Sequence, residues 1–207
     1  MVRLAVGLAV GLVLTPAVIL MVRRSVTRLP RWAVIATAVA VSAAGAAVAV
    51  WPPVTIAFGV AFAALAIPAA VVDGLEHRIP DRFSLPLCGA VVVTALAAAV
   101  VSNDFGSGLR AVAGGAAWGA ALLLSYLMTG QPGPGDVKLA PSVGILLGWF
   151  GWPWVLGGLL ATYVLTAVMG LVGVLLHRYS FREGQVPMGP SMVTVAFVCG
   201  TIAAASG

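Results

Sequence analysis

The sequence has 207 residues, of which 61% are hydrophobic and only 8% are charged, with a formal net charge of +5. A soluble domain carries about a quarter charged residues, so this composition excludes a water-soluble globular protein and indicates an integral membrane protein. Positive charge is also typical of nucleic-acid-binding proteins. No basic stripe with interleaved aromatic residues accompanies it here, so we expect no nucleic acid partner.

Apolar stretches between charged or turn-rich breaks predict an all-α, polytopic membrane protein with about eight transmembrane helices. We expect one domain, residues 1–207, whose spans are 4–22, 33–50, 54–72, 85–101, 108–129, 138–152, 154–176 and 188–205. The sixth has about 15 residues, fewer than the ~17–25 that cross a bilayer. It must therefore lie in a thinned region, be shielded by neighbouring helices, or be partly re-entrant.

The first span resembles a secretory signal in having Arg3 before an apolar run. Several arginines follow that run, however, and no small-residue cleavage site is evident, so we interpret it as a retained span. Tryptophans next to the helix breaks are expected at the membrane interface, as aromatic belts are. They are Trp51, Trp149, Trp152 and Trp154.

The positive charges fix the expected orientation. With both termini outside, the cytoplasmic loops hold nine cationic residues: Arg23, Arg24, Arg28, Arg31, Arg78, Arg82, Lys138, Arg178 and Arg182. Only Arg3 and Arg110 lie outside, so the positive-inside rule supports this topology. Five of the six acidic residues share the cytoplasmic side, namely Asp73, Glu76, Asp81, Asp136 and Glu183. Chemistry is therefore expected at the cytoplasmic face, with anionic lipid headgroups as partners of the arginines.

Small residues spaced four apart predict close helix packing. Such stripes are Gly7 with Gly11, Ala111-Gly115-Gly119, and Ala140-Gly144-Gly148. The two cysteines, Cys88 and Cys199, form no CxxC pair, and the two histidines, His77 and His177, flank arginines. We therefore expect no metal site and no cofactor.

Asp73 ends one apolar run and Asp136 opens another, so both are expected at cytoplasmic helix ends. Two carboxylates at one membrane depth can share a proton, one acting as base toward water and the other as acid toward a carbonyl. Helix position favours negative charge on Asp136, at a helix start, over Asp73, at a helix end. The plain alternatives are a solvated loop acid for Asp73 and a helix N-cap for Asp136.

The remaining polar residues have simpler interpretations. Asp81 follows Pro80 and is expected in a turn or cap, while Glu76 and Glu183 are expected to be solvated. Lys138, the only lysine, lies two residues past Asp136 and does not face the same way on a helix. It is either an interface anchor that reaches the headgroups or a residue that orients the loop or contacts substrate.

These motifs resemble those of the bacterial prepilin peptidases and their archaeal preflagellin relatives, which are GxGD intramembrane aspartic proteases. The matching residues are Gly133-x-Gly135-Asp136-x-Lys138-Leu139 and Asp73-x5-Ile79-Pro80-Asp81. A further match is Val186-Pro187-Met188-Gly189-Pro190, in which Met188 replaces an aromatic residue, and a weaker one is Arg28-Leu29-Pro30.

The resemblance implies that Asp73 and Asp136 are catalytic and that Gly133, Gly135 and Lys138 support the second aspartate. Ile79, Pro80, Asp81, Pro187, Gly189 and Pro190 match motif positions whose role it does not define. The implied substrate is a type IV pilin-like precursor, cut between its leader and its apolar helix at the cytoplasmic face of the cell membrane.

One departure from the family matters. Many members carry a zinc-binding insert with two CxxC pairs after the first helix and also N-methylate the trimmed pilin. This chain has a short connection there without cysteine, so we expect the short form, without methyltransferase activity.

Two other classes of protein fit the residues. A small solute or ion transporter would also use intramembrane aspartates and glycine-broken helices. Its charged groups are expected near the midplane rather than at one face, and no sequence repeat relates the two halves. A structural protein of a secretion machine is the third class, and it predicts that Asp73 and Asp136 tolerate alanine.

Overall fold

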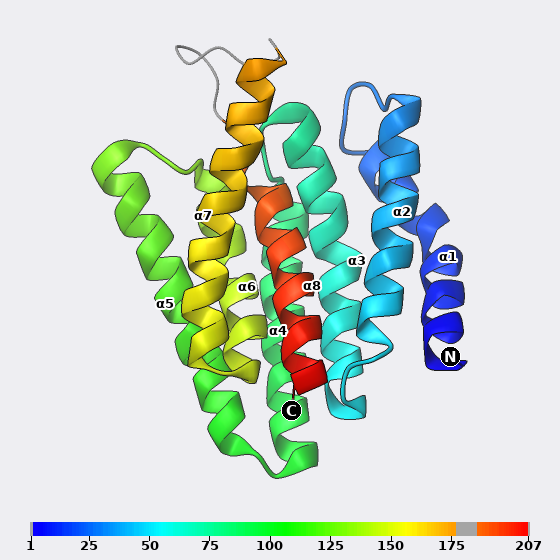
Figure 1. Ribbon diagram of the computed structural model, residues 1–207, viewed down its shortest axis with the longest axis vertical. Helices are drawn as coiled ribbons and strands as arrows, with labels where there is room; N and C mark the ends of the chain where they lie inside the picture. Colours follow the sequence, from blue (N-terminus) through cyan, green and yellow to red (C-terminus); the bar gives the residue numbers. More distant parts are fainter. Residues whose placement is uncertain (1, 177–185, 207) are drawn as a thin grey trace.

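A computed structural model describes residues 2–176 and 186–206, and this part of the chain forms eight α-helices without a strand (Figure 1). The helices are α1 (Val2–Arg23), α2 (Arg31–Val48), α3 (Pro53–Glu76), α4 (Asp81–Ser102), α5 (Phe105–Thr129), α6 (Pro134–Phe150), α7 (Trp152–Leu175) and α8 (Gly189–Ser206). The prediction of an all-α polytopic membrane protein is confirmed, since seven of these helices are long and apolar enough to cross a membrane. Two differences between the observed and the predicted helix boundaries involve the aspartates. Helix α3 continues past Asp73 to Glu76, and α6 begins at Pro134, before Asp136.

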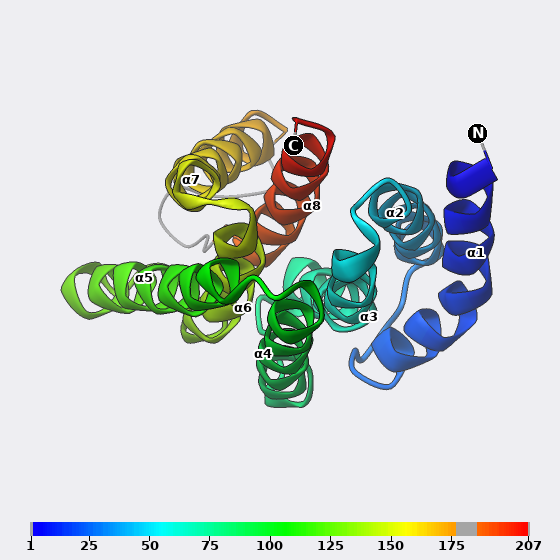
Figure 2. The ribbon, with the colours of Figure 1, turned by 90° about the horizontal axis from the view of Figure 1, so that it is seen from below.

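Helix α6 is the shortest and the most enclosed. It has 17 residues, of which eleven are buried, and it contacts α5, α4, α8, α7 and α3. Seen along the bundle, α6 lies among these helices (Figure 2). Of the three explanations for its short length, shielding by neighbouring helices is therefore the one that the packing supports.

The small-residue stripes form two close helix contacts. Gly11 faces Ser42, whose Cα would lie 2.8 Å from a Cβ at position 11, so α1 and α2 approach closely. The stripes of α5 and α6 face each other: a Cβ at Gly148 would lie 2.9 Å from the Cα of Ala111. The predicted role of these residues in helix packing is confirmed. It matters for function because it fixes the position of α6.

Trp51 corrects the interface prediction. Its side chain is fully buried, and its Nε1–H donates to Thr201 Oγ1 at 3.2 Å. The ring lies edge-on to Phe150 and close to Phe197, in space left by Gly59 and Gly200. Trp51 therefore connects α2, α3, α6 and α8 instead of reaching the lipid headgroups. Trp152, by contrast, is exposed.

The far end of α6 is capped by Arg110. Its guanidinium donates from Nε to Gly148 O at 3.0 Å and from Nη2 to Trp149 O at 2.9 Å. A cation at these last carbonyls complements the helix dipole. Asp104 caps the start of α5, and the Ser107 hydroxyl and N–H that donate to its carboxylate lower the pKa of Asp104.

Up-and-down connectivity gathers all the motifs at one end of the bundle. The α1–α2, α3–α4 and α5–α6 connections and residues 186–188 lie at that end, at the top of Figure 1. The α1–α2 hairpin lies at one edge, where α1 contacts no described helix other than α2 and α3.

Candidate active site

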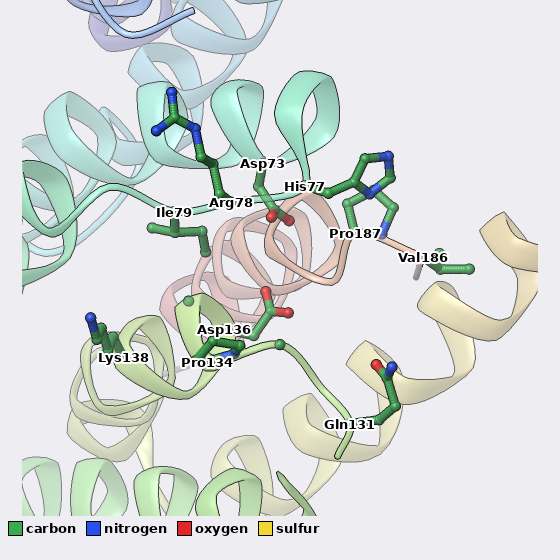
Figure 3. Close-up of a pocket in the computed structure, with 12 residues that line it drawn as sticks. Asp73, His77, Arg78, Ile79, Gln131, Pro134, Asp136, Lys138, Val186 and Pro187 are labelled. Carbon is green, nitrogen blue, oxygen red and sulfur yellow. The ribbon is translucent and has the colours of Figure 1, made fainter. Parts of the chain in front are cut away.

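A pocket of about 170 Å³ lies at this end, between the end of α3, the start of α6 and residues 186–187 (Figure 3). Asp73 and Asp136 both line it, and their carboxylates point toward each other across it in Figure 3. It is further lined by His77, Arg78, Ile79, Gln131, Gly133, Pro134, Gly135, Lys138, Val186 and Pro187. Three separate sequence motifs therefore meet at one pocket.

Asp73 occupies the last turn of α3 and is buried, with 4% of its surface exposed. Its Oδ2 accepts a hydrogen bond from the backbone N–H of Gly189 at 3.0 Å, across 116 residues of sequence. The interpretation of Asp73 as a solvated loop acid is therefore wrong. The cause is that α3 continues to Glu76 and keeps Asp73 inside the bundle.

Gly189 has a steric reason to be glycine. A Cβ at this position would lie 2.8 Å from Asp73 Oδ2, too close for an ordinary contact. Pro187 and Met188 before it are buried, and Pro190 after it would lie 3.7 Å from a Cβ at Gly74. The motif at residues 187–190 therefore places the first N–H of α8 directly against the carboxylate of Asp73. In the sequence, this motif stands out only by its resemblance to the prepilin peptidase motif, and nothing there predicts its contact with Asp73.

Asp136 lies in the first turn of α6 and is 5% exposed. Gly133, not Asp136, occupies the N-cap position, so the interpretation of Asp136 as a helix cap is wrong. Within the described residues, its Oδ1 is buried and has no hydrogen-bond partner. An unpaired buried carboxylate oxygen is costly in a structural role, and here it belongs to a residue that lines the pocket.

The two motif glycines differ in how closely they are packed. A Cβ at Gly135 would lie 3.0 Å from both the backbone nitrogen and the Cβ of Ile79, which is itself buried. A Cβ at Gly133 would lie 3.6 Å from its nearest neighbour, Asp136 Oδ2, which is ordinary contact. Gly135 therefore allows the α3–α4 connection to lie against the start of α6, whereas Gly133 meets no such constraint.

Lys138 has an ion-pair partner. Its Nζ lies 2.6 Å from Asp81 Oδ1, and both side chains are about half exposed. In Figure 3 Lys138 points away from Asp136. Asp81 is the first residue of α4, and Pro80 holds the cap position. The pair therefore joins the start of α4 to the start of α6, and Asp81 is not the cap that its sequence position indicated.

Glu76 is not simply solvated. Its Oε1 accepts the backbone N–H of Thr27 at 2.7 Å, and its Oε2 pairs with Arg78. Arg78 also donates to Ser25 O at 3.4 Å. These contacts fasten the α1–α2 connection to the end of α3. The predictions for His177, Arg178, Arg182 and Glu183 fall outside the described residues.

This arrangement suits acid–base chemistry on a polar bond. Two cationic residues that line the pocket have acidic partners other than the two aspartates: Lys138 pairs with Asp81, and Arg78 pairs with Glu76. Gly189 N–H favours negative charge on Asp73, while the start of α6 favours it on Asp136. These contributions oppose each other, so helix position does not assign the roles of acid and base.

In the part of the chain that the structure describes, no group of three His, Cys, Asp or Glu residues could hold a metal ion. Besides the two carboxylates, the pocket is lined by polar side chains, namely His77, Arg78, Gln131 and Lys138, and by glycine and apolar residues.

Comparison with known proteins identifies the family. The model of the type IV leader peptidase family matches residues 60–205, from within α3 to the end of α8. Both aspartates and the motifs at residues 133–138, 79–81 and 186–190 lie inside the match, whereas Arg28-Leu29-Pro30 and the α1–α2 hairpin lie outside it. No curated protein and no solved structure matches the chain. Because the match covers well over half of the sequence, the chain belongs to the type IV leader peptidase family.

Proposed function

We propose that the protein is a membrane-embedded aspartic endopeptidase that removes the leader from type IV pilin-like precursors, with Asp73 and Asp136 as its acid–base pair. The observation that carries this proposal is the convergence of two buried carboxylates from α3 and α6 on one pocket, where Asp136 Oδ1 has no partner among the described residues. Membership of a peptidase family supports hydrolysis as the reaction.

The two carboxylates share one proton in this mechanism, because two like charges at one buried site do not both ionise easily. The ionised carboxylate removes a proton from a water molecule, whose oxygen attacks the scissile carbonyl carbon. The protonated carboxyl group gives its proton to the carbonyl oxygen. When the tetrahedral intermediate collapses, the C–N bond breaks and the leaving amine takes the proton that came from water. A hydroxyl group of the intermediate returns its proton to the other carboxylate, which restores the single shared proton.

The substrate must be unwound at the scissile bond, since the carbonyl of a helical amide is engaged and covered. Gly135 lets the chain segments at the pocket approach closely, and Val186 and Pro187 add apolar side chains to the pocket lining. A pocket at the end of the bundle suits a substrate whose apolar helix lies in the membrane and whose leader lies in water.

The distribution of charge supports a cytoplasmic placement of this pocket. Among the described residues, its end of the bundle carries Arg23, Arg24, Arg28, Arg31, Arg78, Arg82 and Lys138, whereas the other end carries Arg3 and Arg110. An excess of cations marks the cytoplasmic side of a membrane protein. Anionic lipids of that leaflet are the proposed partners of the arginines. The carboxylates lie at this end and not at mid-bundle, which disfavours the transporter alternative.

Co-expression with a candidate precursor tests the proposal. The wild type should remove the leader, seen as a mobility shift on a gel, whereas Asp73→Asn and Asp136→Asn should leave the precursor uncut at equal protein level. Asp104→Asn is the matched control, since this aspartate caps α5 at the other end of the bundle. Normal processing by either pocket variant would refute the proposed pair. Methylation of the product is not expected and can be read from the mass of the same product.

A further inference from the structure

An apolar groove runs between α2 and α8, with α3 as its floor. Figure 2 shows how these three helices are arranged. It consists of two cavities, of about 230 Å³ and about 460 Å³. Both are lined by Ala40, Ile67, Val193 and Thr194, so they form one continuous space. We call it the α2–α8 groove.

The chain on either side of α2, one wall of the groove, is fastened at both ends: to α3 at the pocket end and to α8 at the other. At the pocket end, Glu76 holds the Thr27 N–H in front of α2 at 2.7 Å. At the other end, Trp51 follows α2 and donates to Thr201 of α8 at 3.2 Å. Protein interiors pack closely, so apolar walls held apart in this way imply an apolar occupant from the membrane.

The shape of the groove fits the face of a helix. From Trp32 to Ala47, its α2 wall is about 22 Å long at 1.5 Å per residue. The side chains toward it include Ala36, Ala40, Ala43 and Ala47, at helical spacing. Small residues along a straight wall let a second helix approach closely, where lipid gives no hydrophobic driving force.

The groove ends next to Asp73 and Gly189. Gly74 and Pro190 line its pocket end, and they directly follow Asp73 and Gly189, which are joined by the hydrogen bond between Gly189 N–H and Asp73. A helix in the groove would therefore end beside the contact that separates the groove from the active-site pocket. A single chain lying along the groove and unwound at this point can reach the carboxylates.

We propose that the α2–α8 groove binds the apolar helix of the precursor and presents the segment before it to Asp73 and Asp136. This inference rests on the proposed function and adds the site that holds the substrate in the membrane. Helix α2 lies outside the family match, so the N-terminal hairpin supplies one wall of the site.

Two measurements on the full chain in liposomes test the groove. The first compares cleavage of a full precursor with cleavage of a short peptide that lacks the apolar helix. In Ala43→Leu, an exposed groove alanine gains a side chain that fills the groove, and the precursor-to-peptide ratio of kcat/KM should fall by about tenfold. Ala97→Leu makes the same change at an exposed position of α4 and should leave the ratio unchanged.

The second measurement does not require cleavage. In an Asp136→Asn background, a photoreactive diazirine residue at Val198, in the groove, should form an adduct with labelled precursor. The same residue at Val93, an exposed position of α4, should not.

The outcomes separate the two proposals. Adducts from Val198 to lipid alone, equal precursor adducts from both positions, or an Ala43→Leu ratio equal to that of Ala97→Leu would overturn the groove. If the wild type cuts neither substrate but Val198 still binds the precursor, the groove stands and the proposed function fails. If the wild type cuts the precursor and Val198 gives no precursor adduct, the groove fails alone.

Discussion

At the level of single residues, the glycines near the pocket have different tasks. Gly189 leaves room for the carboxylate of Asp73, and Gly135 leaves room for Ile79. Gly133 has no neighbour that a Cβ atom would crowd. The GxG spacing in the sequence does not distinguish these cases, because the distinction depends on neighbours that are distant along the chain.

Replacing Gly189 should therefore damage catalysis. In Gly189→Ala the new Cβ would lie 2.8 Å from Asp73 Oδ2, so the carboxylate or the start of α8 must move. We expect kcat/KM to fall by about 100-fold, since small displacements of a catalytic group have effects of this size. Gly133→Ala, with its nearest contact at 3.6 Å, is the control and should stay close to wild type. Equal rates for both variants would contradict the proposed role of Gly189.

The residue-level predictions from sequence were partly correct for a physical reason. The sequence placed Asp73 and Asp136 at helix ends on the same side, because apolar runs reveal where helices stop. It did not predict the burial of both side chains or the Gly189 contact, since a hydrogen bond across 116 residues depends on tertiary packing. The ion pair between Asp81 and Lys138 was missed for the same reason.

Between elements, the Asp81–Lys138 pair joins α4 to α6 beside the pocket. A half-exposed ion pair contributes at most about 1 kcal/mol to stability, so we expect its effect mainly on position. Lys138→Asp should lower the cleavage rate, because two acidic groups then repel each other next to Ile79 and Gly135.

The double variant Asp81→Lys/Lys138→Asp should recover most of the rate, and the loss in the single variant should shrink at high salt. Cleavage kinetics at two salt concentrations measure both effects. A single variant that keeps the full rate at low salt would show that the pair does not position the site.

The contact between α5 and α6 should determine stability. In Gly144→Ala the new Cβ would lie 2.8 Å from the Cβ of Trp118, and overpacking of this kind typically costs about 1–3 kcal/mol. Gly157→Ala, on an exposed part of α7 with no atom within 4 Å, should leave stability unchanged or raise it slightly. Thermal unfolding in detergent compares the two variants. The account of this contact fails if Gly144→Ala is as stable as Gly157→Ala.

Element-level packing was predictable where it depended on residue size. The stripes of small residues in α5 and α6 do form a contact, because spacing by four places them on one helix face. The burial of Trp51 was not predictable from its position beside two prolines, since it results from the space left by Gly59 and Gly200 on other helices.

For the whole molecule, the arginine distribution predicts that the pocket faces the cytoplasm. In a chain with Cys88 and Cys199 replaced by alanine, Ser102→Cys and Gln131→Cys mark the two ends of the bundle. A membrane-impermeant maleimide applied to intact cells should label Ser102→Cys at once. It should label Gln131→Cys only after the membrane is disrupted. The reverse pattern would contradict the orientation.

The number and order of the helices were predictable because charged or turn-rich breaks separate the apolar runs, and all of these runs except the sixth are long enough to cross a bilayer. The short α6 left three possibilities open, and only the packing of five helices around it favoured shielding. The groove between α2 and α8 could not be predicted from the sequence, because it is an open space whose shape depends on how these helices pack in three dimensions.

The central claim is that Asp73 and Asp136 act as one catalytic unit. It is tested most directly by the kcat of the purified chain in liposomes for Asp73→Asn, Asp136→Asn and the double variant, with Asp104→Asn as control. We predict that each single variant loses about as much activity as the double variant, because residues that act as a unit give strongly non-additive losses. Single losses that multiply in the double variant, or a single variant that keeps wild-type activity, would contradict the account.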